Sequence, residues 1–207
     1  MKRITSRNKR RRTTVNQVTH KRLSTIPDDI DTTTTVILLV DVQPEWWTSK
    51  VARLFPKFPK HIQALCHTCR TRGLRLIHIR AKYNQSINGY PNNRWLNQFV
   101  KLNPEKTTRI NGQATSFARE RRGELVIYKP AFDSFIGTSL ETILKKMHVR
   151  TIYIAGMLTS VCVHHTAHGA FIRGYKVHVL RQCCADRTRE HHNSSFRLYG
   201  NYMYRVS

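Results

Sequence analysis

Short apolar segments alternate with amphipathic ones from residue 33 to the end of the chain. The apolar segments are rich in β-branched and leucine side chains, which predicts strands buried on both faces of a sheet. The predicted strands are Thr33–Val40, Leu74–Ala81, Leu125–Lys129, Arg150–Ala155 and Tyr175–Leu180. Apolar residues recur at helical spacing in Pro56–Arg72, after Ser139 and after Thr159, and Thr188–Tyr199 is typical of a closing helix. This alternation predicts an α/β fold, in which helices cover both faces of a parallel sheet.

Residues 1–30 show neither helical nor strand periodicity. We interpret them as a mobile basic arm that precedes one domain over residues 31–207. The cluster Lys9–Arg12 is typical of a nuclear-import signal or a nucleic-acid contact, and the arm's composition also resembles an organellar transit peptide. No apolar run is long enough to span a membrane, and no secretory signal is evident. Five irregularly spaced cysteines favour a reducing compartment, so we expect an intracellular and most simply cytoplasmic protein.

The chain carries 36 Lys and Arg against 12 Asp and Glu, a formal net charge of +24. Such a field attracts nucleic acid, anionic membrane surface or anionic substrates. A general basic bias of the source's proteins would produce the same composition without any partner. The charge therefore leaves the partner open.

Three of the predicted strands lead directly into ionisable residues at their carboxyl ends. Asp41 follows the first strand, Lys129 ends the third, and Cys162 lies shortly after the fourth. Parallel strands finish at the same edge of a sheet, so we expect these three side chains to meet in one cleft. A carboxylate there can accept the proton of a thiol, an ammonium can hold the carboxylate in place, and backbone N–H groups can receive an oxyanion.

Cys162 falls in the first turn of a predicted helix, where the helix dipole favours the thiolate. A buried cysteine that only packs the helix against the sheet is the plainer alternative for one residue taken alone. Cys66 and Cys69 form a C-x-x-C pair within the helix Pro56–Arg72, but no second Cys/His pair follows at ligand spacing. A buried helix face is therefore favoured over a zinc site at this pair. Neither a Rossmann glycine motif nor a P-loop is present, and we predict no cofactor.

Across residues 33–207 the sequence resembles the isochorismatase-like cysteine hydrolase family. The segments that carry the resemblance are VILLVDVQ, KPAFDSFIGTSLETIL, AGMLTSVCVHHTAHGAF and GYKVHVLRQCCADRT. The resemblance implies a three-layer α-β-α sandwich with a six-stranded parallel sheet, a Rossmann-like arrangement, and usually a homo-oligomer. It also implies a catalytic triad of Asp41, Lys129 and Cys162, a cis peptide between Met157 and Leu158, and an oxyanion hole built from the N–H groups of Leu158 and Cys162.

Some positions depart from that family's pattern. The D-x-H metal motif of its nicotinamidase branch is missing, because the corresponding segment reads IRAKYNQS. Gln182 and Gly169 stand where the family often has acidic residues. From the first departure we predict that no metal is bound, and neither of the others touches the triad.

Our main hypothesis is a metal-independent cysteine hydrolase, an amidohydrolase that cleaves a small amide, ureido or carbamoyl compound through an acyl enzyme. The substrate would be a small molecule, and the basic surface would suit an anionic one. Candidate pocket walls are Trp46, Trp47, Trp95, Phe132 and Phe135, each of which could equally be core or interface packing. Two alternatives stay open: a hydrolase of the vinyl ether isochorismate, and a basic protein that binds nucleic acid through its arm on a retained hydrolase fold.

Overall fold

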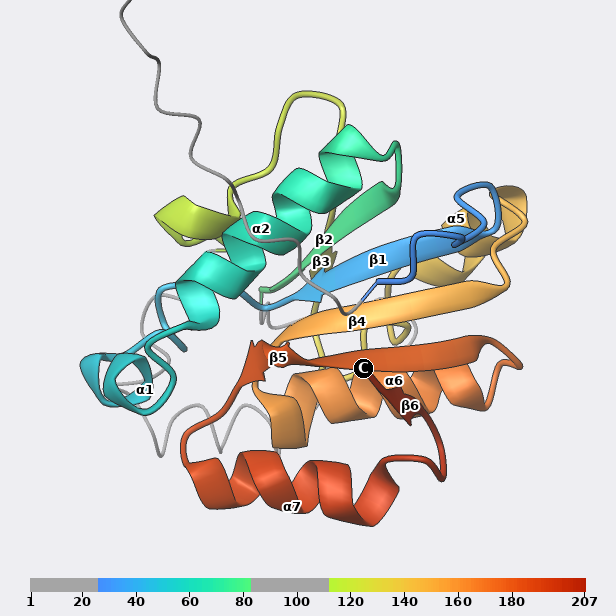
Figure 1. Cartoon of the computed structure of the whole chain (residues 1–207). Helices are drawn as coiled ribbons and strands as arrows, with labels where there is room; N and C mark the ends of the chain where they lie inside the picture. Colours follow the sequence, from blue (N-terminus) through green and yellow to red (C-terminus); the bar gives the residue numbers. More distant parts are fainter. Residues whose placement is uncertain (1–25, 83–111) are drawn as a thin grey trace, which may run out of the picture.

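The computed structural model describes residues 26–82 and 112–207, and its centre is a six-stranded sheet (Figure 1). The strands are β1 Thr35–Val40, β2 Arg75–Ala81, β3 Leu125–Lys129, β4 Thr151–Met157, β5 Lys176–Ala185 and β6 Arg205–Val206. All neighbouring pairs are parallel, in the order β3-β2-β1-β4-β5-β6. The predicted six-stranded parallel sheet is confirmed.

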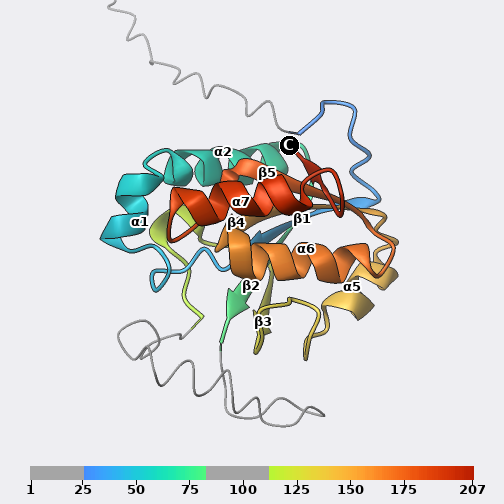
Figure 2. The ribbon, with the colours of Figure 1, turned by 90° about the horizontal axis from the view of Figure 1, so that it is seen from below.

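Helices cover both faces of the sheet (Figure 1, Figure 2). The helical segments are α1 Ser49–Leu54, α2 Phe58–Thr71, the 3₁₀ turn η1 Ser116–Ala118, α5 Leu140–Lys146, the π-helical turn η2 Thr159–Val163, α6 His164–Phe171 and α7 Arg189–Tyr199. The side chains of β1 alternate between two cores. Val36 and Leu38 pack with α5, α6 and α7, whereas Ile37 and Leu39 pack with α1 and α2. The three-layer α-β-α sandwich is therefore also confirmed.

The largest differences from the predicted strands concern β5 and β6, and the other strand ends shift by at most two residues. β5 continues to Ala185, five residues past the predicted end, and it includes the exposed residues Arg181 and Gln182. The sixth strand, β6, has only two residues, so no periodicity could reveal it and only the family resemblance implied it. Most of the predicted basic arm lies outside the described residues, but Ile26 within it is buried in the core beneath α1 and α2.

β1 and β4 approach each other closely at the carboxyl edge. Gly156 has φ +133°, and a Cβ there would lie 1.9 Å from the carbonyl oxygen of Val40. Only glycine fits this position. The close approach brings the end of β1 beside the turn that follows β4.

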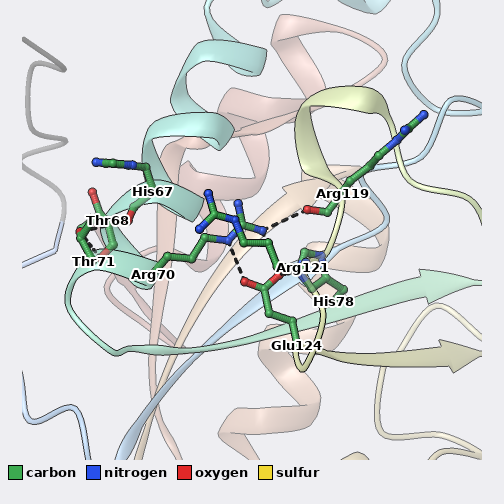
Figure 3. A network of polar contacts seen from close by, with 8 residues as sticks. All are labelled: His67, Thr68, Arg70, Thr71, His78, Arg119, Arg121 and Glu124. Atoms are coloured by element: carbon green, nitrogen blue, oxygen red, sulfur yellow. Dashed lines mark hydrogen bonds and ion pairs between the residues drawn. The ribbon is translucent and has the colours of Figure 1, made fainter. Parts of the chain in front are cut away.

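Glu124 joins α2 to β2 and to the loop before β3 (Figure 3). Arg70 of α2 donates to both of its carboxylate oxygens, at 2.7 and 2.9 Å. The buried ring of His78 lies 2.9 Å from Oε2, and the N–H of Arg121 donates to the same oxygen at 2.8 Å. Although burial opposes ionisation of the carboxyl group, these hydrogen bonds outweigh it and lower the pKa of Glu124 to about 2.

None of the helices within residues 26–82 and 112–207 is both long and apolar enough to cross a membrane.

We predict that Glu124→Gln lowers the free energy of unfolding by about 3 kcal/mol at pH 7, because the carboxylate is the form that Arg70 stabilises. The folded pKa lies below the unfolded one, so this stabilisation is present above about pH 5 and is lost as the pH falls towards the folded value. Urea unfolding of both proteins at pH 7 and at acid pH measures the difference.

Glu190→Gln is the matched control, because Glu190 is exposed on α7 and forms no ion pair with a described residue. Its effect should stay within about 1 kcal/mol, the size expected for an exposed acid in the first turn of a helix. A Glu124 variant as stable as this control, or one whose deficit grows in acid, would contradict the prediction.

Candidate functional site

Asp41, Lys129 and Cys162 meet at the carboxyl edge of the sheet. Nζ of Lys129 lies 2.8 Å from Oδ2 of Asp41, and both side chains are fully buried. The thiol of Cys162 is within hydrogen-bonding reach of both groups. β2 lies between β3 and β1 in the sheet, and it ends opposite Lys129 in Ala81. The small side chain of Ala81 leaves room for Lys129 to extend past β2 to Asp41.

Asp41 stands where the chain turns out of β1. Its φ of 49° is in the left-handed region, which Asp and Asn adopt more readily than most residues. Its N–H donates to the carbonyl of Ile79 at 2.9 Å, which ties the turn to β2. These features hold the carboxylate beneath the strand ends instead of in solvent.

Gln43 holds this turn from the other side, although its role was not predicted from the sequence. Its side chain is fully buried and pairs with both backbone groups of Ala81: Oε1 accepts from the N–H at 2.7 Å, and Nε2 donates to the carbonyl at 3.2 Å. The amide thus continues the β1–β2 ladder past the last residue of β1. A buried polar residue directly after a strand is the signal that could have indicated this function.

Lys129 keeps its positive charge despite complete burial. Burial by itself opposes the charge, but the Asp41 carboxylate and the Cys162 sulfur outweigh it and raise the pKa of the ammonium. Nζ also donates to the carbonyl of Ala131 at 2.8 Å. A charged, hydrogen-bonded lysine therefore lies beside the thiol.

The expectation that the helix dipole favours the thiolate of Cys162 is wrong. Burial raises the pKa of the thiol to about 12, and the neighbouring Asp41 carboxylate adds to this effect while Lys129 opposes it. The side chain is only 4% exposed, and it lies in the π-helical turn η2 instead of the first turn of a regular α-helix. The thiol keeps its proton, and the Asp41 carboxylate is the adjacent acceptor.

The turn that carries Cys162 is held by residues from β5 and α7. The structure has the expected cis peptide between Met157 and Leu158. The hydroxyl of Thr159 lies 3.1 Å from the carbonyl of Ala185 and 2.9 Å from Nδ1 of His192. The carbonyl can only accept, so the hydroxyl donates its single hydrogen there and accepts from Nδ1 of His192. Burial lowers the pKa of His192 to about 4, so the ring is neutral at pH 7 and carries its proton on Nδ1.

Asp186 is the second support of this turn. It is fully buried at the end of β5, and Oδ2 accepts the N–H of Ser160 at 2.7 Å. Oδ1 accepts the N–H of Arg187 at 2.7 Å. Neither Asp186 nor His192 was predicted from the sequence, since their partners lie far away along the chain. A buried acid directly after a strand was again the available signal.

The predicted pocket aromatics lie in different surroundings. Trp46 and Trp47 are half-buried near α2, and the Trp47 ring lies 5.2 Å from that of Phe58. Phe132 is half-buried, with its ring 5.8 Å from that of His165. Phe135 is buried in the core and stacks on Tyr175. Trp95 lies outside the described residues. Leu158, the other predicted oxyanion residue, is buried directly before η2.

Cys66 and Cys69 are buried in α2, where burial raises the pKa of the thiols to about 11 and about 12. Within the part of the chain that the structure describes, no three His, Cys, Asp or Glu side chains are grouped so that they could hold a metal ion.

We predict that Asp41→Asn lowers the pKa of Cys162. The Asp41 carboxylate raises this pKa and the Lys129 ammonium lowers it, so the neutral amide leaves the lysine as the dominant neighbour. The measurement is the rise of thiolate absorbance at the ultraviolet edge with pH, taken as a difference from the same protein carrying Cys162→Ser. That subtraction removes the absorbance of the four other cysteine thiols. A pKa equal to or higher than that of the unmodified protein would refute this electrostatic account.

We also predict that Thr159→Val lowers the free energy of unfolding by about 1–3 kcal/mol, because the isosteric change leaves the Ala185 carbonyl and the His192 N–H without a partner. Urea unfolding measures it. Thr142→Val on the exposed side of α5 is the control and should have a much smaller effect. If both variants lost the same free energy of unfolding, the hydrogen bonds of the Thr159 hydroxyl would not stabilise the fold.

Known proteins are similar to this chain over most of its length. The Isochorismatase domain family matches residues 35–206, from the first residue of β1 to the last of β6. YaaI, an isochorismatase family protein of Bacillus subtilis (strain 168), is 23% identical over 154 residues, which cover 74% of this chain and 80% of YaaI. RutB of Methylorubrum extorquens, a ureidoacrylate amidohydrolase, is 25% identical over 171 residues, covering 72% of this chain and 68% of RutB.

A solved structure shares the fold of this chain. A cysteine hydrolase from Pseudomonas syringae pv. phaseolicola 1448A superimposes with a TM-score of 0.70 at 18% identity, over 86% of this chain and 89% of that one. At this identity the likeness concerns the fold alone. The family match, however, spans the entire sheet and the helices between its strands, and the chain therefore belongs to the isochorismatase family of hydrolases.

Proposed function

We propose that this protein is a metal-independent cysteine hydrolase that cleaves the C–N bond of a small amide, ureido or carbamoyl compound. The observation that carries the proposal is the buried Asp41–Lys129 ion pair in contact with the thiol of Cys162. A structural cysteine needs only apolar neighbours, whereas this one lies beside a proton acceptor and a fixed positive charge.

The reaction starts from a protonated thiol. As the sulfur attacks the substrate carbonyl carbon, Asp41 accepts the thiol proton, so the nucleophile forms only when the electrophile is present. The new C–S bond gives a tetrahedral intermediate. The proton on Asp41 then passes to the leaving nitrogen, the C–N bond breaks, and the amine or ammonia leaves a thioester on Cys162.

Water completes the cycle. Asp41 accepts a proton from the attacking water, a second tetrahedral intermediate forms, and the C–S bond breaks. The sulfur recovers its proton from Asp41, and the acid product leaves. Lys129 stays charged throughout and keeps Asp41 oriented through their buried ion pair.

The oxyanion of both intermediates would lie against the backbone N–H groups of Leu158 and Cys162. This assignment follows from their positions at the start and within the η2 turn beside the thiol. The anchoring of that turn by Thr159 and Asp186 would keep both N–H groups in place. Trp46 and Phe132 are candidates for the pocket wall, together with Trp95.

RutB supports the choice of a C–N bond, because its name assigns it an amidohydrolase reaction. An isochorismate hydrolase and a pure nucleic-acid binder are the two alternatives. The presence of Cys162 favours the amidohydrolase, since a thiol nucleophile serves acyl transfer directly. A homo-oligomer and an intracellular location stay predictions.

Mass spectrometry of the intact protein tests the proposal. Acid-quenched mixtures with a panel of amides, ureides and carbamoyl compounds should show an adduct on Cys162 equal in mass to the acyl group. Cys162→Ala should lower turnover by about 10⁴-fold or more, because it removes the nucleophile. Asp41→Asn should also lose most turnover.

Cys66→Ala is the control, since it removes another buried thiol far from the ion pair, and it should keep its activity. No adduct and no turnover across the panel would refute the proposal. Hydrolysis of isochorismate that survives Cys162→Ala would favour the vinyl-ether alternative.

A further inference from the structure

The segment that forms α1, α2 and β2 contains no acidic residue. Glu45 and Glu105 are consecutive acidic residues in the sequence, and Lys and Arg recur between them. Along the outer side of α2 the exposed residues recur every three or four positions, which places them in one stripe. They are Lys57, Lys60, Gln63, His67 and Thr71.

The loop after η1 contacts α2 beside this stripe, through Arg70, and carries three exposed arginines. η1 packs against α2, where the Phe117 and Phe58 rings lie 6.1 Å apart, and Arg70 of α2 donates to the carbonyl of Arg119 at 3.0 Å. Arg119, Arg121 and Arg122 are exposed. Figure 3 shows Arg119 and Arg121 beside the end of α2, with the Arg119 side chain directed away from Glu124. We call Lys57, Lys60, Arg119, Arg121 and Arg122 the basic α2 face.

The two acidic residues in this loop cannot neutralise the basic α2 face, because each is already paired with an arginine that points inward. Glu120 binds the buried Arg80, which lowers the pKa of that carboxyl group. Glu124 binds Arg70 and His78. By contrast, none of the five outward side chains of the basic α2 face forms an ion pair within residues 26–82 and 112–207.

The chemistry of this face suits phosphates better than a lipid surface. Membrane-surface helices place large apolar side chains beside their basic ones. The large apolar side chains exposed in the described residues are Leu125 and Tyr128 on β3, Phe171, Ile172 and Leu198 at the ends of α6 and α7, and Tyr202. None of them lies on α2 or among residues 119–122. The exposed side chains of the α2 stripe are instead hydrogen-bonding groups of the kind that contact phosphate and sugar.

We propose that the basic α2 face binds the phosphate backbone of nucleic acid without base specificity. The 14 residues of α2 extend about 20 Å, which matches about six successive phosphates of one duplex strand. The face shares no residue with the Asp41–Lys129–Cys162 site, so this binding is a second property and does not rest on the proposed hydrolase activity.

The test compares two variants of the full chain with equal loss of charge. One carries Lys57→Gln, Lys60→Gln, Arg119→Gln, Arg121→Gln and Arg122→Gln. The control carries Lys146→Gln, Arg150→Gln, Lys176→Gln, Arg197→Gln and Arg205→Gln, which are exposed positions away from α2. Both keep the basic N-terminal arm. Fluorescence anisotropy with labelled mixed-sequence RNA and duplex DNA gives the affinity at several salt concentrations.

We expect the face variant to bind about tenfold or more weakly than the unmodified protein, and the control to bind nearly as tightly as the unmodified protein. The slope of log K against log salt concentration should become shallower by about 0.7–0.9 for each phosphate that the variant no longer neutralises. Circular dichroism and thermal unfolding verify the fold of both. Lys60→Gln and Arg122→Gln, as single changes at exposed positions, repeat the test if the fivefold variant does not fold.

Equal weakening in the two variants would mean that net charge alone acts, and would overturn the proposal. So would undiminished binding by the face variant, which would assign the contact to the arm. Binding to phosphatidylserine vesicles without binding to either nucleic acid would overturn it in favour of a membrane surface.

Discussion

The buried ion pair between Asp41 and Lys129 is the interaction on which the carboxyl edge of the sheet depends. Taking one charge out of water costs several kcal/mol, so neither residue could be fully buried without the other. The pair forms because β2 and β3 end opposite each other, at Ala81 and Lys129, while β1 ends two positions earlier, opposite Ile79, and leads directly into Asp41. The clamp of Gln43 on Ala81 keeps the end of β1 in that register. Cys162 then completes the site from η2, the turn after β4, and Gly156 permits the close approach of β4 to β1.

Two effects compete for the proton of Cys162, and their magnitudes decide the outcome. A helix N-terminus stabilises a nearby negative charge by about 0.3–1 kcal/mol, and up to about 2 kcal/mol in partly buried geometries. Burial next to Asp41 raises the thiol pKa from 9.0 to about 12, which is a free-energy difference of about 4 kcal/mol against the thiolate. Burial therefore prevails in the resting site. In the proposed mechanism, Asp41 is therefore the proton acceptor in the step that uses the sulfur.

The arginines on the α2 side of the sheet fall into two groups, because a buried charge requires a partner and an exposed one does not. Arg70 and Arg80 point inward and take up Glu124 and Glu120. The exposed Lys and Arg residues of the basic α2 face need no partner for stability, since water solvates them. The two acidic residues of the loop after η1 are thus used for internal structure, and the lysines and arginines of the basic α2 face keep their charge on the surface. One surface property, a strong basic face, follows directly from how the interior is neutralised.

Local pattern was sufficient to predict the five longer strands, their parallel arrangement and the placement of Asp41, Lys129 and Cys162 at one edge. Apolar runs and helical spacing are properties of neighbouring residues, so the sequence alone carries them. β6 was beyond this reasoning, because two residues show no period.

Only the tertiary structure decided which side chains meet. Gln43 and Ala81, Thr159 and His192, and Ser160 and Asp186 are separated by 38, 33 and 26 positions along the chain. The protonation of Cys162 is likewise decided by the tertiary structure, because it depends on burial by residues distant in sequence. The sequence by itself determined the fold class and the edge at which the chemistry lies, since both follow from short-range order. The partners and charge states of that edge were decided by packing, since desolvation and hydrogen-bond geometry exist only once the strands have assembled.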